Sequence, residues 1–230
     1  MKQLKYTLEV CTSSLNSVIN AVAGGAQRVE LCSALSVGGL TPSLGLLKTV
    51  REMFPQLLIH VLIRPRVGDF VYSEEEMQVM LKDIDAALPY ADAIVCGALD
   101  SKGHVDVAAT RRLLAASQGK PFTFHRAFDR CCDAMRAVDD VMELGCRRLL
   151  TSGLQPTAAE GIPLIKQLVE RVGDRLIVMP GSGVNPGNAR HILHATGAVE
   201  IHGSASTLHD NGLKETSAAT VRTLLAELNE

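Results

Sequence analysis

The chain has 230 residues, a usual length for one α/β barrel, and its 47% hydrophobic content is ample for a sizeable core. Its formal charge of −2 and its 3% aromatic content, with no tryptophan, argue against a nucleic-acid surface. No apolar run reaches the roughly 18 residues that cross a bilayer, and Met1–Tyr6 lead into a strand rather than a signal peptide. We therefore expect one cytoplasmic domain, residues 1–230, without a nucleic-acid or membrane partner.

Short apolar segments alternate with helical patterns along the whole chain. This alternation implies parallel strands joined by helical crossovers. Eight such units in this length favour a closed (βα)8 TIM barrel, an α/β fold, and a doubly wound open sheet is the alternative. The expected strands are Leu4–Val10, Arg28–Cys32, Leu57–Ile63, Ala93–Cys96, Phe122–His125, Arg148–Thr151, Leu176–Met179 and Val199–His202.

Local signals set the expected helix ends. Ser73 begins a capping box with acidic residues in the first turn, and Pro186 is expected at the first helical position behind the cap Asn185. The expected helices cover about 15–23, 44–53, 74–88, 107–117, 133–144, 158–172 and 186–195, with a last helix that ends near 228.

The first two strands end alike, in Glu9-Val10-Cys11 and Glu30-Leu31-Cys32. Residues two apart in a strand point to the same side, so each strand aims a carboxylate and a thiol at one face. Neighbouring strands lie roughly 4.8 Å apart, so two thiolates there could hold Cu(I), with Cys96 as a possible third ligand. Two ordinary small buried residues are the simpler interpretation from the residues alone.

Two glycine-rich loops follow the seventh and eighth strands, Gly181-Ser182-Gly183 and His202-Gly203-Ser204. Barrels often bind phosphate between these loops, where the backbone can approach a ligand closely. The sequence therefore predicts an anion site, although the glycines could simply make tight turns. The residues expected to contribute are Arg66, Ser152, Gly181, Gly183, Gly203 and Ser204.

Charged residues also follow the third and fifth strands, in Ile63-Arg64-Pro65-Arg66 and His125-Arg126-Ala127-Phe128-Asp129. Arginine binds anions, and histidine can act as acid or base near neutral pH. An Arg126–Asp129 ion pair and solvation of each arginine are the structural alternatives.

Three strand carboxylates, Glu9, Glu30 and Glu200, would be expensive to bury unless they are paired or bind something. The candidate partners are Arg64, Arg66, Arg126 and His202. If the protein is an enzyme on a small anionic molecule, the hypothetical catalytic set is Glu9, Glu30, His60, Arg64, His125, Arg126 and Asp129. Internal ion pairing is an equal alternative for the carboxylates, and His60 alone is typical of a satisfied core residue.

Six segments of the chain, in order, resemble the CutC family: Arg28-Val29-Glu30-Leu31-Cys32, Gly38-Gly39-Leu40-Thr41-Pro42-Ser43, Ile63-Arg64-Pro65-Arg66, Gly68-Asp69-Phe70, Thr123-Phe124-His125-Arg126-Ala127-Phe128-Asp129 and Leu150-Thr151-Ser152-Gly153. The resemblance implies a cytoplasmic TIM barrel, a homodimer or larger oligomer, associated with copper homeostasis. It also implies that Cys11 and Cys32 match the cysteines proposed as copper ligands, while no reaction is established for the family.

The sequence departs from the family pattern at two places. Val67 stands where the family usually has glycine, which bears on the loop after Arg66. The segment after Ala205 is shorter than in longer members, which bears on oligomer contacts or a lid.

Overall fold

Eight short runs of buried aliphatic residues form one parallel sheet in the computed structural model, which describes residues 6–208 and 214–229. Leu4 and Lys5, expected in the first strand, lie outside the described residues. The strands are β1 (Thr7–Thr12), β2 (Arg28–Leu31), β3 (Leu58–Leu62), β4 (Ala93–Cys96), β5 (Phe122–Phe124), β6 (Arg148–Thr151), β7 (Ile177–Pro180) and β8 (Glu200–Gly203). They are ordered β7-β6-β5-β4-β3-β2-β1-β8, so each strand from β1 to β7 lies beside its sequence neighbours.

The sheet curls until β7 and β8 meet, which makes a nearly closed barrel. A parallel bridge between Gly181 and His202 joins the two ends. A Cβ atom at Gly181 would lie 2.6 Å from the Leu150 Cδ1 atom, so glycine lets the two ends approach without moving that side chain. The single-domain TIM barrel is thereby confirmed over the open sheet, because a doubly wound sheet reverses its strand order and this one does not.

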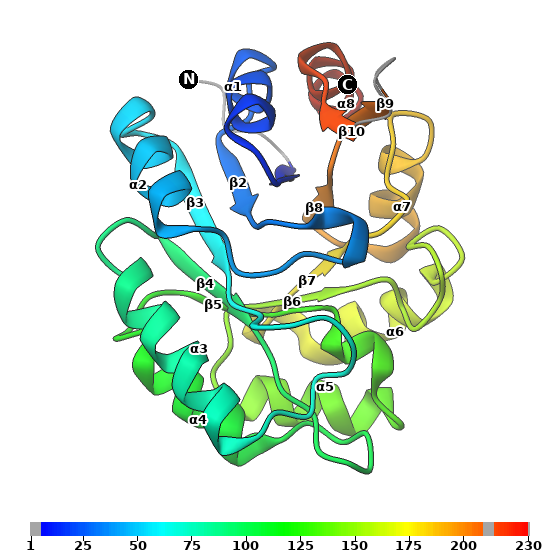
Figure 1. Cartoon of the computed structure of the whole chain (residues 1–230). Coiled ribbons are helices and arrows are strands. Elements are labelled where there is room, and N and C mark those ends of the chain that lie inside the picture. The colour runs from blue at the N-terminus through cyan, green and yellow to red at the C-terminus, as the bar shows by residue number, and fades with distance from the viewer. Residues whose placement is uncertain (1–5, 209–213, 230) are drawn as a thin grey trace.

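Helices surround the strands, and α8 lies beside α1 (Figure 1). Their first turns are fixed mostly by side chains, as at Ser73, whose predicted capping box with Glu76 is present. The helices are α1 (Leu15–Ala23), α2 (Leu44–Met53), α3 (Glu74–Ala87), α4 (Val107–Ala116), α5 (Ala134–Glu143), α6 (Ile162–Val172), α7 (Ala189–Thr196) and α8 (Ala218–Asn229).

Two helix starts were predicted wrongly, and a hairpin was missed. Helix α6 begins at Ile162 rather than at Ala158, because Gly161 packs against the Ser152 backbone before the helix starts. Helix α7 begins at Ala189 rather than at Pro186. The hairpin pairs β9 (Ser206–Leu208) with β10 (Lys214–Thr216).

Strand β1 begins at Thr7 and continues two residues past the expected end at Val10, to Thr12, because it pairs with β2 in a register that sets Cys11 opposite Glu30. Along each strand, apolar residues such as Val10 and Val29 belong to the large core that reaches the helices. The alternate residues, Glu9 and Glu30 among them, point into the barrel. The barrel interior is therefore charged, and these charges must be neutralised by one another or by a ligand.

Candidate metal and anion site at the barrel mouth

A cavity of about 290 Å³ opens at the carboxyl ends of the strands. This is the end of the barrel where TIM-barrel active sites are built. The cavity brings together predicted residues from six strand ends and the loops that follow them. Its lining includes Cys11, Glu30, Arg64, His125, Arg126, Gly183, His202, Gly203 and Ser204.

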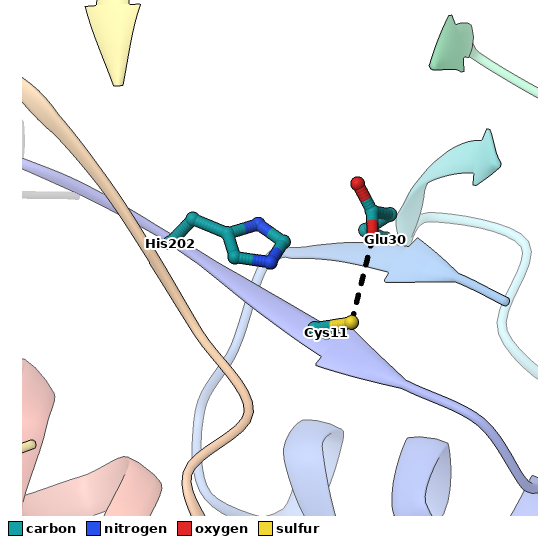
Figure 2. A group of neighbouring side chains, drawn as sticks. All are labelled: Cys11, Glu30 and His202. Atoms are coloured by element: carbon teal, nitrogen blue, oxygen red, sulfur yellow. Dashed lines mark hydrogen bonds between the residues drawn. The ribbon is translucent and has the colours of Figure 1, made fainter. Parts of the chain in front are cut away.

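Two thiols, a carboxyl group and an imidazole gather at one side of the cavity. One ligand atom each of Cys11, Glu30 and His202 lies within 4.8 Å of the others, and Figure 2 shows the three side chains turned toward one another. The Cys11 thiol donates to the Glu30 Oε1 atom at 3.4 Å. Its sulfur lies 3.9 Å from that of Cys32, whose thiol donates to the Thr12 carbonyl. The predicted thiol pair therefore has a carboxyl group and an imidazole beside it.

The cluster holds its protons tightly in the absence of a ligand. The hydrogen bond with Cys32, followed by burial, raises the pKa of the Cys11 thiol well above its usual value. Burial also raises the pKa of Glu30, because one carboxylate oxygen, Oε2, has no hydrogen-bond partner among the described residues. For His202, burial opposes protonation, but the carboxylates of Glu30 and Glu9 raise its pKa overall.

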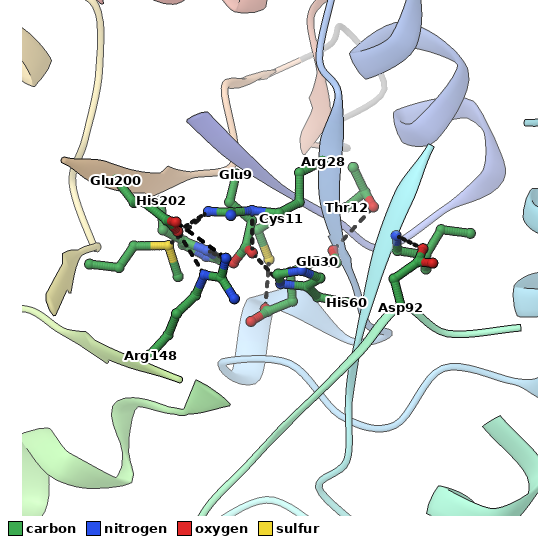
Figure 3. A network of polar contacts seen from close by, with 12 residues as sticks. Glu9, Cys11, Thr12, Arg28, Glu30, His60, Asp92, Arg148, Glu200 and His202 are labelled. Carbon is green, nitrogen blue, oxygen red and sulfur yellow. Dashed lines mark hydrogen bonds and ion pairs between the residues drawn. The ribbon is translucent and has the colours of Figure 1, made fainter. Parts of the chain in front are cut away.

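Beneath this cluster, the fully buried Glu9 is surrounded by an arginine and two histidines (Figure 3). Its carboxylate lies 2.6 Å from His60 Nδ1, 2.9 Å from His202 Nδ1 and 3.0 Å from Arg28 Nε. Burial alone would raise the pKa of Glu9, but these neighbours hold it well below its usual value. Glu9 is therefore a paired carboxylate that also orients the ring of His202.

Glu200 is paired in the same layer by two arginines that the sequence analysis did not single out. Arg28 bridges Glu9 and Glu200, and Arg148 Nε lies 2.7 Å from the Glu200 carboxylate. Of the partners expected for the strand carboxylates, His202 alone pairs with one in the described part of the chain. The missed signal was spacing: Arg28 lies two residues before Glu30 on β2 and shares its face.

Arg64 and His125 face the cavity from its other side, and both are buried, with exposed fractions of 6% and 5%. The Arg64 guanidinium donates to the carbonyls of Val37, Gly39 and Gly68. It pairs with no carboxylate in residues 6–208 and 214–229, and there its Nε has no partner. The sequence analysis named both residues, but not that Arg64 would lack a carboxylate partner among the described residues.

Other predicted anion ligands are already occupied. Arg66 lies outside the cavity lining, where it binds Glu76 and, at 3.0 Å, Asp69. The Ser152 backbone N–H and hydroxyl both donate to Asp129, and the Gly181 N–H donates to the Thr151 carbonyl. None of these groups points an unused donor into the cavity.

Arg126 lines the cavity but forms an ion pair with Asp129, which the sequence analysis gave as the alternative to anion binding. Its Nε donates to Asp129 at 2.7 Å, and its side chain is 44% exposed. Asp129 also accepts a 2.5 Å bond from the Thr151 hydroxyl, so it fixes the loop after β6.

The proposed third thiol, Cys96, does not join the cluster. It lies in the large core that faces the helices, where burial raises its pKa to about 12. Cys11 and Cys32 instead belong to a separate small apolar cluster with Leu62 and Val95. His202, rather than Cys96, lies beside Cys11 and Glu30. The Glu-x-His spacing of β8 repeats the Glu-x-Cys spacing of β1 and β2.

The helix that follows the Gly181-Ser182-Gly183 loop begins well after it, so its N-terminus does not reach the two glycine-rich loops. Gly183, Gly203 and Ser204 line the cavity, but α7 starts at Ala189. The intervening turn is held by Asn188, whose amide donates to the Gly183 carbonyl. Any anion there would meet loop groups rather than the first turn of a helix.

Residues 6–207 match the model of the CutC family. The chain belongs to the CutC family. A human copper homeostasis protein cutC homolog is 47% identical over 91% of this chain and 77% of its own length. A CutC family protein of Bacteroides thetaiotaomicron is 48% identical over 87% of this chain and 81% of its own length. The solved structure of a CutC protein from Streptococcus agalactiae superposes with a TM-score of 0.82, at 37% identity, over 86% of this chain and 98% of that one.

Membership of the CutC family links this chain to copper homeostasis. The matched region contains the whole cavity lining, from Cys11 to Ser204. Among the described helices, none is long and apolar enough to span a membrane.

Proposed function

We propose that this CutC protein binds Cu(I) through the thiolates of Cys11 and Cys32, with His202 as a third ligand. The observation that carries the proposal is the 3.9 Å separation of the two sulfur atoms. Metal–thiolate bonds of about 2.3 Å place two sulfurs of one site within about 4.6 Å of each other. Thiolate is also the ligand type that selects Cu(I).

The surroundings of His202 fit a metal ligand. Glu9 accepts a hydrogen bond from His202 Nδ1 when the proton is on that nitrogen, which leaves Nε2 as the ligand atom. Carboxylate–histidine pairs of this kind orient metal-binding imidazoles in proteins. Because the Cys11 thiol holds its proton strongly, metal binding must release protons, so affinity rises with pH.

A titration of the reduced protein with Cu(I) in the presence of a competing chelator tests this site. We expect the double variant Cys11→Ser, Cys32→Ser to lose at least about 100-fold in affinity. Cys132→Ser is the matched control, because Cys132 is exposed and lies outside the cavity lining. Unchanged affinity in the double variant would rule out these ligands.

The cytoplasmic location and the homodimer implied by the family resemblance are part of the proposal. Six cysteines without a disulfide among the described residues suit a reducing compartment. Light scattering on the purified chain tests the homodimer.

A second candidate function is catalysis on a small anionic molecule. It is favoured by the unpaired Glu30 oxygen and the unpaired Arg64 guanidinium facing one cavity, since copper binding by thiolates uses neither. Under this hypothesis Glu30 or His125 would move a proton, and the arginines would bind charge. A thermal-shift screen of metabolites tests it, because a true ligand raises the melting temperature by mass action.

A further inference from the structure

Arg64 carries the least compensated buried charge of the cavity. A guanidinium has five N–H donors, and three are used on the carbonyls of Val37, Gly39 and Gly68. One unused donor is on Nε and one on Nη2, which makes a single bond to a described residue. A buried cation without a counter-charge is costly to keep, so the fold gains when an anion occupies this position.

The unused donors are held in place rather than free to swing into solvent. The Arg64 guanidinium stacks on the ring of Phe70, 4.8 Å from its centroid. The same ring makes an edge contact with the His125 imidazole, at 5.0 Å between centroids. Phe70 therefore fixes the guanidinium and the imidazole around one part of the cavity, to which all three residues contribute.

His125 adds a neutral donor to the same place. Its Nδ1 accepts from the Ala127 backbone N–H, so the ring proton is on Nε2. Burial, with the nearby Arg64 charge, lowers its pKa to about 3, so the imidazole is neutral at physiological pH. Nε2 is buried and has no partner in the described residues.

We propose that Arg64 and His125 form a subsite for one oxyanion group, a carboxylate or a phosphate, of a small molecule held in the cavity. The unused guanidinium donors bind two oxygens of the anion, and His125 Nε2–H donates to it. Guanidinium is suited to such paired contacts with either group. The volume of about 290 Å³ limits the ligand to a small metabolite.

This subsite differs from the glycine-loop site expected from the sequence. It is built from side chains after β3 and β5, whereas Gly183 and Ser204 follow β7 and β8 across the cavity. Those loops and the Cys11–His202 side of the cavity remain available for the rest of the molecule. The inference rests on the second candidate function, because only a small anionic ligand would use the subsite.

Titration calorimetry with inorganic phosphate in one arm and succinate in the other tests the subsite and identifies the anion class. We expect saturable binding of at least one of them, with the dissociation constant raised at least about tenfold by Arg64→Gln. Arg66→Gln is the matched control, since it removes the same charge from an arginine already paired with Glu76. It should change the constant less than about twofold.

Two variants of His125 keep the test valid if Arg64→Gln does not fold. His125→Asn retains an acceptor for the Ala127 N–H but removes the Nε2 donor, and should weaken binding severalfold. His125→Gln can place a donor near the Nε2 position and should bind more tightly than His125→Asn. Equal binding by both, or by the Arg64 and Arg66 variants, would overturn the subsite, as would no saturable binding of either anion.

The outcomes separate this inference from the proposed functions. If the protein binds phosphate or succinate but no screened metabolite is turned over or raises the melting temperature, the catalytic candidate is removed and the subsite remains. Absence of anion binding in a protein that still binds Cu(I) through Cys11 and Cys32 would remove the subsite alone.

Discussion

The inside of the barrel has two layers that contain similar residue types. In one layer the charged side chains are paired with one another, and in the other most polar side chains keep an atom without a described partner. The paired layer comprises Glu9, Arg28, His60, Arg148 and Glu200, and each carboxylate in it contacts at least two cationic partners. The open layer, nearer the mouth, comprises Cys11, Glu30, Arg64 and His125, and three of these retain a buried polar atom without a described partner. His202 connects the layers through Glu9. We infer that the paired charges stabilise the barrel, and we propose that the polar atoms without a described partner contact a ligand.

The largest expected effect comes from breaking the paired layer at its centre. Arg28→Met removes the bridge between Glu9 and Glu200 and leaves less compensated buried carboxylates. We expect it to lower the free energy of unfolding by about 3–5 kcal/mol, measured by urea denaturation. The control Arg112→Met breaks an exposed pair with Glu74 and should change stability little. Equal losses in the two variants would mean that the paired layer does not stabilise the fold.

A sharper comparison uses one glutamate from each layer, replaced by glutamine. Glu9 has a folded-state pKa below its ordinary 4.5, so its charge stabilises the fold above pH 4.5, and that contribution is lost as pH falls through the folded pKa. Glu9→Gln should therefore cost at least about 2 kcal/mol at neutral pH and less in acid. Urea denaturation from neutral pH down to well below pH 4.5 measures this dependence, because the contribution is lost only between 4.5 and the lower folded pKa.

Glu30→Gln should show the opposite pH dependence. Burial raises the pKa of Glu30 above 4.5, so the native protein loses stability as pH rises from 4.5 through the folded pKa. Glutamine removes that loss while its oxygen can still accept from the Cys11 thiol. The variant should thus gain stability relative to the unmodified protein as pH rises. Parallel profiles for the two variants would contradict the division into layers.

Much of the fold was predictable because its signals are local. Short apolar segments between helical patterns located the strands, and Ser73 with Glu76 fixed the start of α3. The start of α7 was not predictable in this way, because Asn188, rather than the proline signal at Pro186, closes the preceding turn. The hairpin β9–β10 was missed because each strand has only three residues.

The reactive side chains at the strand ends were predictable from the sequence. Which of them form ion pairs with residues far away in the sequence was not. The Glu-x-Cys spacing indicated that Cys11 shares a face with Glu9 and Cys32 with Glu30, whereas His202 was named only as a partner for a strand carboxylate. The same reasoning could not separate Arg64 from Arg66, two residues apart. Glu76, on α3, takes Arg66 out of the site, and only the folded structure shows that nothing similar reaches Arg64 among the described residues.

Arg126 provides the finest test of the comparison, since it lines the cavity like Arg64 but is paired like Arg28. If the lack of a counter-charge makes an arginine an anion ligand, Arg126→Gln should change phosphate or succinate affinity less than about twofold. Because the Arg126 side chain is 44% exposed, its pair with Asp129 should contribute less than about 1 kcal/mol to stability. Calorimetry and urea denaturation measure the two effects. Arg126 already has a carboxylate 2.7 Å away. A loss of anion affinity as large as that of Arg64→Gln would therefore show that an arginine near the cavity binds the anion whether or not it is paired.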